Sequence, residues 1–291
     1  MNLNQKIRAQ IENKTGSKII SSSSLSGGCI SNAYKIKTET GVEYFLKIND
    51  VSPDKMFEKE AHGLVEIKKA NTIRVPDVIL FDDEFILLEF ISSKNKSKSF
   101  FTDFGRSFAM MHKVKGKKYG FYEDNYIGSN PQKNIPDESE ANNWVNFYFN
   151  KRILYQFKLA EHNSYAGREL RKGILALEKS IEDILAGSAE PPALLHGDLW
   201  GGNYIVDEKG NACLIDPAVY YGHREADLAM TKLFGGFSSE FYNAYNECFP
   251  LQEGFEYRGP IYKLYHVLNH LNLFGSGYYS QAIALINTYE K

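Results

Sequence analysis

A polar loop followed by a short hairpin constrains this chain more than any other part of its sequence. The loop, residues 195–203, reads LHGDLWGGN, and LIDP follows at 214–217. Two short apolar runs, 204–206 and 212–215, lie on either side of the turn sequence DEKG. The two arms of a hairpin return to the same point, so we expect Asp216 to lie beside Asn203.

The polar residues of this segment are those that phosphoryl transfer requires. A carboxylate, Asp198, can accept the proton of an attacking hydroxyl, and oxygens of Asn203 and Asp216 can hold Mg²⁺ on the phosphates of ATP. We therefore predict Asp198 as the catalytic base and Asn203 and Asp216 as metal ligands. A capped loop followed by a hairpin with surface acids is the alternative. The ordered set HGD-x4-N, hairpin and DP favours an ATP-dependent phosphotransferase.

Size and composition exclude several other classes of protein. The chain has 291 residues, enough for two packed lobes, and its 43% hydrophobic and 24% charged residues are ordinary for a globular protein. A formal net charge of -2 gives no general basic field for nucleic acid. The three cysteines form neither a disulfide framework nor a zinc spacing, which favours a reducing cytoplasm. No apolar run has the length of a signal peptide core or a membrane span.

The order of patterns along the chain predicts a two-lobed, kinase-like α+β fold. Alternating apolar residues at 33–37 and 42–48 predict one hairpin, and 78–81 and 85–90 predict a second. Beyond residue 91 the apolar spacing is mainly that of helices. A lysine-rich connector, 92–99, is the expected boundary. A small antiparallel β lobe, 1–91, should bind the nucleotide, and a larger helical lobe, 92–291, should carry catalysis and the acceptor.

A lysine in the first lobe is the expected phosphate-binding cation. Lys47 lies in the strand sequence YFLKI, where alternation can point it inward toward the α- and β-phosphates of a nucleotide. Glu60 on the following helix is the expected partner, with Glu58 as the alternative. A lysine that snorkels from an edge strand is the competing interpretation. The glycine loop upstream and the carboxylate helix downstream favour nucleotide binding.

A glycine loop and the last strand of the lobe complete the expected nucleotide site. Gly27, Gly28 and Cys29 lie in the loop SGGCISN, whose backbone N–H groups can approach phosphates closely, although a simple β-turn has the same character. Backbone groups from Glu89 to Ile91 can pair with an adenine edge. The alternative is an ordinary edge strand that runs into the connector.

Candidates for the acceptor pocket follow the metal aspartate. Tyr221, Arg224 and Glu225 either line this pocket or order the loop that carries them. Trp200 on the catalytic loop and His270 on a late helix are further candidates.

Two residues near the catalytic loop have expected structural roles. Asp227 stands at the start of an apolar helix, where it can cap that helix or brace the catalytic loop from below. His196 is expected to hold the loop rather than to act as an acid or base. Both expectations place support for Asp198 within the second lobe.

The sequence resembles the fructosamine kinases, or ketosamine-3-kinases, within the aminoglycoside and choline kinase-like enzymes. HGD-x4-N and DP are common to that wider group, whereas the block that follows DP and the segment LNHLN are more particular to the ketosamine branch. The resemblance covers almost the whole chain, and Gly201 is a small departure in the loop. The motifs are GGCIS at 27–31, FLKIN at 45–49, MFEKEA at 56–61, HGDLWGGN at 196–203, DPAVYYGHREADLAM at 216–230, LFGGF at 233–237 and YHVLNHLN at 265–272.

The resemblance implies an activity and its cofactors. Such kinases use ATP and Mg²⁺ to phosphorylate the 3-hydroxyl of ketosamines, which form when sugars react with free amines or with protein lysines. The phosphate would be on C3, next to the C2 carbonyl, so enolisation toward C1 can expel it and free the amine, which initiates deglycation. Compact members of the family are expected to prefer ribulosamine or erythrulosamine over fructosamine.

Two alternatives stay open at this point. The first is a kinase for another hydroxylated small molecule, such as an aminoglycoside or amino alcohol. An acidic insertion would favour a polycationic acceptor, and the segment 116–136 is mixed in charge. The second is a catalytically silent nucleotide-binding module, against which the intact Lys47, Asp198, Asn203 and Asp216 argue.

Cys29 has a possible redox role, and the resemblance points the same way because relatives often carry cysteine in this loop. Backbone N–H groups directed at an anion also stabilise a thiolate, which makes a thiol easier to oxidise. A homodimer linked by a Cys29–Cys29 disulfide is then one expected state, and a monomer is the other. The competing interpretation is a small loop residue of ordinary reactivity.

Overall fold

The structure is a computed structural model that describes residues 3–25, 32–49, 51 and 53–289. Their contacts divide the chain into two compact units. The first contains the chain up to Phe100 together with Tyr204–Asp216, and the second contains Phe101–Asn203 and the chain from Pro217 onward.

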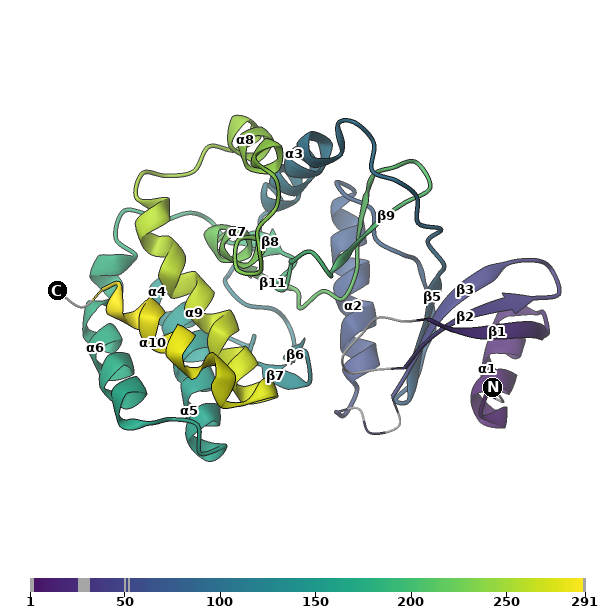
Figure 1. Cartoon of the computed structure of the whole chain (residues 1–291), viewed down its shortest axis with the longest axis horizontal. Coiled ribbons are helices and arrows are strands. Elements are labelled where there is room, and N and C mark those ends of the chain that lie inside the picture. The colour runs from purple at the N-terminus through teal and green to yellow at the C-terminus, as the bar shows by residue number, and fades with distance from the viewer. Residues whose placement is uncertain (1–2, 26–31, 50, 52, 290–291) are drawn as a thin grey trace. The chain divides into compact units, whose positions relative to one another are not determined.

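The first unit is built on a five-stranded antiparallel sheet in the order β1-β2-β3-β5-β4 (Figure 1). Both hairpins expected from the alternating pattern, β2–β3 and β4–β5, are confirmed. The elements are α1 (Gln5–Thr15), β1 (Ile19–Leu25), β2 (Asn32–Thr38), β3 (Glu43–Ile48), α2 (Met56–Ala70), β4 (Val78–Phe81) and β5 (Phe85–Glu89).

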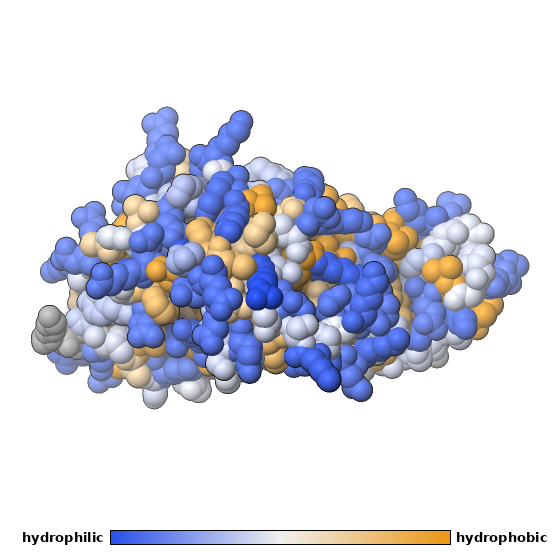
Figure 2. Space-filling view, turned by 90° about the horizontal axis from the view of Figure 1, so that it is seen from above, coloured by the Kyte–Doolittle hydropathy of each residue, from blue (hydrophilic) through white to orange (hydrophobic). Residues whose placement is uncertain are grey.

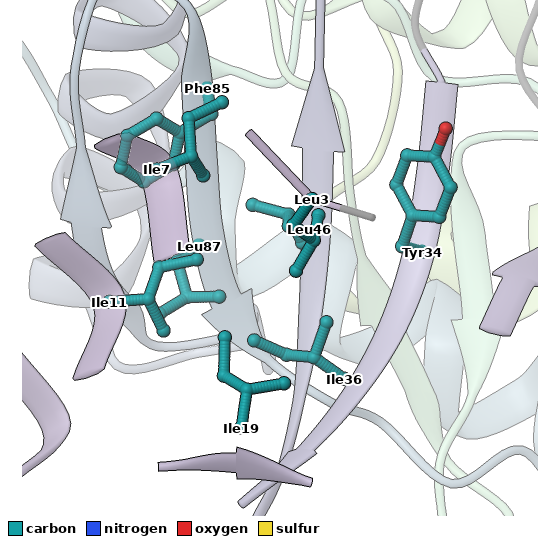
Figure 3. Packing of buried hydrophobic residues seen from close by; sticks show 9 residues of the cluster. All are labelled: Leu3, Ile7, Ile11, Ile19, Tyr34, Ile36, Leu46, Phe85 and Leu87. Atoms are coloured by element: carbon teal, nitrogen blue, oxygen red, sulfur yellow. The ribbon is translucent and has the colours of Figure 1, made fainter. Parts of the chain in front are cut away.

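Helix α1 covers one face of this sheet and forms a compact core with it (Figure 3). Ile7 and Ile11, four residues apart on α1, lie beside Phe85 and Leu87 of β5 in this cluster. Burying an aliphatic side chain of this size contributes about 1.5–3 kcal/mol. Successive side chains of a strand alternate between faces, so Lys47 leaves the sheet on the face opposite Leu46.

The hairpin β9–β10, formed by Tyr204–Val206 and Ala212–Leu214, belongs to the first unit by its contacts. The backbone N–H of Lys94 donates to the carbonyl of Val206 (3.2 Å), and that of Ser97 donates to the carbonyl of Gly210 (3.2 Å). The boundary expected from the sequence followed residue 91 and placed this hairpin with the second lobe. The contacts instead extend the first unit to Phe100 and include the hairpin. The hydrogen bonds of Lys94 and Ser97 link segments that are more than a hundred residues apart, so no local pattern in the sequence indicated them.

The second unit is mainly helical, as the sequence predicted (Figure 1). Helix α9 contacts α5, α7 and α10, which makes it the central helix of the unit. The elements are α3 (Phe100–His112), β6 (Asn125–Ile127), β7 (Asn130–Gln132), α4 (Trp144–Tyr148), a π-helical turn (Phe149–Leu154), α5 (Tyr155–His162), α6 (Arg168–Ile184), β8 (Ala193–Leu195), β11 (Tyr220–Gly222), α7 (Glu225–Thr231), α8 (Ser239–Cys248), α9 (Phe255–Phe274), a 3-10 turn (Ser276–Tyr278) and α10 (Tyr279–Asn287).

The segment 116–136, which is mixed in charge, contains the short hairpin β6–β7. Its strands do not alternate polar and apolar residues. Buried amide side chains on these strands form hydrogen bonds with the backbone of a neighbouring segment. The side chain of Gln132 donates to the carbonyl of Ala218 (2.9 Å), and that of Asn125 donates to the carbonyl of Val219 (2.8 Å). The hairpin therefore anchors the backbone that directly follows the DP motif.

The surface is mainly hydrophilic, as the ordinary share of charged residues in the sequence predicts (Figure 2). Figure 2 shows a face on which hydrophilic residues predominate and hydrophobic residues lie in small patches. Among the described residues, no helix is both long and apolar enough to cross a membrane.

Candidate active site

Lys47 is the centre of a cluster of buried charges in the first unit. Its ammonium donates to Glu60 Oε1 at 2.8 Å and also to Asp216 Oδ1. The Lys47 and Glu60 side chains are 14% and 11% exposed, whereas that of Asp216 is 40% exposed. Burial alone would lower the pKa of Lys47, but the charges of Asp216 and Glu60 outweigh it and raise this pKa above its ordinary value. Lys47 is therefore a fixed cation, and its predicted pairing with Glu60 is confirmed.

Asp216 is held in an uncommon backbone conformation directly after β10. Its φ is 55°, in the left-handed region that aspartate tolerates better than most residues. The hairpin register pairs Leu214 with Tyr204, which confirms the predicted hairpin. Asn203 directly precedes Tyr204 in the chain, and Asp216 follows Leu214 by two residues.

The catalytic loop of the second unit brings Asp198 and Asn203 into contact. The Asn203 amide nitrogen donates to the Asp198 backbone carbonyl at 2.8 Å and to its Oδ2 at 3.2 Å. Asn203 is buried and Asp198 is half-buried. Since the amide nitrogen faces Asp198, the carbonyl oxygen of the same amide points away from it. That oxygen is the atom a hard cation would use.

Asp227 braces this loop from below, which is one of the two roles predicted for it. Its carboxylate accepts hydrogen bonds from the backbone N–H groups of His196 (2.7 Å) and Gly197 (2.8 Å). His112 Nε2 lies 3.2 Å from Asp227 Oδ2, and His112 Nδ1 lies 2.7 Å from the Tyr245 hydroxyl. A neutral imidazole that donates to Asp227 and accepts from Tyr245 satisfies both contacts.

The protonation states follow from burial and hydrogen bonding. Burial alone would raise the pKa of the Asp227 carboxyl, but the hydrogen bond from His112 and those from the loop backbone lower it below its usual range. Burial lowers the pKa of His112, and the hydrogen bond to Asp227 offsets only part of that effect. The brace is thus an ionised carboxylate next to a neutral histidine.

Gly197 is required at its position in the loop. Its φ is +84°, and an added Cβ would overlap the carbonyl oxygen of Ala218. The N–H of Ala218 in turn donates to the carbonyl of His196 at 2.9 Å. The two residues that precede Asp198 are therefore fixed by close packing of main chain against main chain.

Trp200 and His270 share an aromatic surface in the second unit. The Trp200 ring, 39% exposed, meets Phe234 edge to face at 6.0 Å between centroids, and Phe234 lies 4.9 Å from the His270 ring. Phe234 thus links the two residues that sequence reasoning had named for the acceptor. It was not named itself, and its place in the LFGGF motif was the signal that could have identified it.

Arg224 and Glu225 form buried ion pairs. The Arg224 guanidinium donates to both oxygens of Glu190 at 2.7 Å, and that of Arg258 donates to both oxygens of Glu225 at 2.6 and 2.8 Å. The backbone of Tyr221 exchanges two hydrogen bonds with Gly120. These contacts support the second of the two interpretations, in which the residues order the loop.

The remaining predicted nucleotide contacts are only partly described. Glu89 ends β5, its N–H donates to the carbonyl of Asp77 (2.8 Å), and Ile91 is buried. Pairing of this backbone with adenine stays a prediction. Gly27, Gly28 and Cys29 lie outside the described residues, and so does the predicted redox role of Cys29.

Comparisons with known proteins agree with these motifs. The sequence profile of the fructosamine kinase family matches residues 3–291. The chain belongs to the fructosamine kinase family. It is 41% identical to the chloroplastic protein-ribulosamine 3-kinase of Oryza sativa subsp. indica over 279 residues, 94% of this chain and 79% of that protein.

Solved structures place this fructosamine kinase family member among kinases of similar fold. A Thermobifida fusca protein, provisionally named a fructosamine-3-kinase, has a TM-score of 0.87 at 31% identity, covering 98% of this chain and 99% of that one. A choline kinase from Streptococcus pneumoniae has a TM-score of 0.66 at 18% identity, covering 98% and 99%. The second likeness shows the fold alone, which is the kinase-like α+β fold predicted from the sequence.

Proposed function

We propose that this protein is an ATP- and Mg²⁺-dependent kinase of the 3-hydroxyl of ketosamines. The observation that carries the proposal is the Lys47–Glu60–Asp216 cluster in a member of the fructosamine kinase family. A relative that is 41% identical bears the name protein-ribulosamine 3-kinase, which supports a ketosamine as the acceptor. The product would be a ketosamine 3-phosphate, from which elimination of phosphate, followed by hydrolysis, can release the amine.

The first unit would bind the nucleotide. Lys47 would contact the α- and β-phosphates, with Glu60 holding its side chain in place, and the loop with Gly27, Gly28 and Cys29 would cover the phosphates. Glu89 and Ile91 would offer backbone groups to adenine. Because the Lys47 ammonium already bridges two carboxylates, it would be oriented before ATP arrives.

The donor atoms fit a magnesium ion. Asp216 supplies a half-exposed carboxylate and Asn203 an amide oxygen that faces away from Asp198, and Mg²⁺ prefers such oxygen ligands. Bound Mg²⁺ would neutralise charge on the transferring phosphate. We assign Asn203 and Asp216 as the residues that hold it.

Asp198 would act on the acceptor. Its carboxylate would accept the proton of the 3-hydroxyl as that oxygen attacks the γ-phosphorus of ATP, and ADP would leave. Asp227, through His196 and Gly197, would keep Asp198 in place. Trp200 and His270 would contact the acceptor, whose protonated amine suits the face of an aromatic ring.

Location and assembly are further parts of the proposal. The free thiols of Cys213 and Cys248 are compatible with the reducing cytoplasm that we propose. The expected assembly is a monomer or a homodimer. The acceptor is either a small ketosamine or a glycated lysine of a protein.

An acceptor screen tests the function. Purified protein with ATP and Mg²⁺ would be given ribulose-lysine, erythrulose-lysine, fructose-lysine or kanamycin, and ADP release would be followed together with the ³¹P spectrum of the product. We expect transfer to the ketosamines, fastest with the ribulose or erythrulose adduct. Transfer to kanamycin alone would replace the proposal by an aminoglycoside kinase, and ATP binding without transfer to any acceptor would indicate a silent nucleotide-binding module.

A further inference from the structure

Arg74, which precedes the Val-Pro sequence before β4, holds the turn of the β9–β10 hairpin. Its Nη1 donates to Asp207 Oδ2 at 3.0 Å and to both oxygens of Glu208 at 2.8 Å. Asp207 is buried, and its other oxygen accepts the N–H groups of Lys209 and Asn211, both at 2.9 Å. The guanidinium thus binds the carboxylate that itself closes the turn.

The backbone of Arg74 contacts β10, the second strand of this hairpin. Its carbonyl accepts the N–H of Leu214 at 2.8 Å, and its backbone also bridges to Cys213 in parallel register. Leu214 is two residues from Asp216, whose left-handed φ depends on fixed neighbours. One residue therefore holds both the turn that precedes β10 and the end of β10, the strand that leads into the predicted metal ligand.

Arg74 also reaches the strand end that we assign to adenine. Its Nη2 donates to Glu89 Oε1 at 2.7 Å, and the other Glu89 oxygen accepts the N–H of Asp77 at 3.2 Å. Three carboxylates, from Asp207, Glu208 and Glu89, converge on one guanidinium that is 29% exposed. Loss of that cation would leave three negative charges facing one another, and they would repel.

We propose that Arg74 is a positioning residue that fixes Asp216 for Mg·ATP and links it to the adenine-binding end of β5. This inference rests on the proposed nucleotide-binding function. Arg74 would touch neither substrate nor metal, and would act through β10 on one side and through Glu89 on the other. The planar fork of arginine serves two directions at once, which the single ammonium of lysine cannot reproduce.

The test compares Arg74→Gln and Arg74→Lys with a matched control, Arg8→Gln. Arg8 is in the same unit and likewise pairs with a carboxylate, Glu12 (3.0 Å), and a backbone carbonyl, Ile19 (3.1 Å). Calorimetry would give the affinity for ATP with Mg²⁺ and with EDTA. Hydrogen exchange would follow the amides of 204–216.

We expect Arg74→Gln to lower the Mg²⁺-dependent gain in ATP affinity about tenfold, the size of effect seen when a residue supporting a metal ligand is removed. Amides of 204–216 should exchange faster than in the wild type. Both the ATP affinity and the exchange rates of Arg74→Lys should lie between those of Arg74→Gln and those of the wild type. Arg8→Gln should match the wild type in both. In turnover assays, KM for ATP should rise while KM for the acceptor stays unchanged.

Two results would overturn the inference. One is a lower melting temperature of Arg74→Gln with unchanged Mg·ATP affinity, which would make Arg74 merely structural. The other is the same loss of affinity in Arg8→Gln, which would make the effect general. If Arg74→Gln does not fold, Arg74→Lys carries the test by the same criteria. Nucleotide binding needs no acceptor, so failure of wild-type protein to phosphorylate a ketosamine would refute the acceptor assignment without deciding the role of Arg74.

Discussion

Replacing Asp227 by asparagine removes one charge from beneath the catalytic loop and keeps the shape of the side chain. In the wild type, the carboxylate accepts two buried N–H groups, from His196 and Gly197, and faces His112. An asparagine has one oxygen, so in either orientation its NH₂ group faces one of these backbone donors. At least one buried N–H therefore loses its acceptor.

The expected cost follows from these contacts. A buried donor without a partner costs about 1–3 kcal/mol, and the hydrogen bond that remains loses its charge assistance, about 1 kcal/mol more. A total of about 2–4 kcal/mol should lower the melting temperature by about 3–7 °C in a chain of this size. The loop would also shift next to Asp198, and a displacement of about 1 Å can cost 10²-fold in rate.

The assay measures the melting temperature and kcat of Asp227→Asn with the best ketosamine acceptor. Asp124→Asn is the matched control, because Asp124 also accepts two backbone N–H groups, from Asn134 (2.8 Å) and Ile135 (3.3 Å), together with a lysine. The control should lose some stability and keep its kcat. Wild-type kcat in Asp227→Asn, or an equal loss in the control, would refute the reasoning.

Three other predictions concern the site and its surroundings. Asp198→Asn should lower turnover by roughly 10²–10⁴-fold with ATP still bound, and near-wild-type turnover would show that Asp198 is not the base. Asp216→Ala should abolish Mg²⁺-dependent transfer, and an unchanged Mg²⁺ titration would exclude it as a ligand. Burial lowers the pKa of His266 to about 3, so as the pH falls below about 6.5 the unfolded chain binds a proton that the folded chain refuses, and stability falls. His266→Gln should reduce the fall of the melting temperature between about pH 6.5 and 4. The control His162→Gln, at an exposed position, should show the same fall as the wild type. Equal pH dependence of the melting temperature in the two variants would contradict the assignment.

Local patterns were enough to predict the elements that carry the site. The alternation around Lys47 predicted a strand whose lysine leaves the sheet on the face opposite Leu46, and the turn sequence DEKG predicted the β9–β10 hairpin. Asp198 and Asn203 lie five residues apart, so their contact could be expected from the loop alone. Such features depend on periodicity and short-range geometry, which can be inferred from the pattern of neighbouring residues.

Contacts between distant segments could not be read in this way. The residue types at 224 and 225 are the same whether their side chains line a pocket or form internal ion pairs. The neighbouring sequence therefore did not show that Arg224 and Glu225 are each paired with an oppositely charged residue. The role of Arg74 was missed for the same reason, since its carboxylate partners Asp207 and Glu208 are more than 130 residues away.

By itself, the sequence determined the hairpins β2–β3, β4–β5 and β9–β10, the helical character of the second unit and the family, because each of these rests on local spacing or on motif identity. The tertiary structure decided that Lys47 binds Asp216 as well as Glu60, that His112 contacts Asp227 beneath the loop, and that the hairpin 204–216 groups with the first unit. The physical reason is the entropic cost of closing long loops, which only the packing of the whole unit can offset. A residue's partner at long range is therefore set by which surfaces bury each other, and no spacing along the chain encodes that choice.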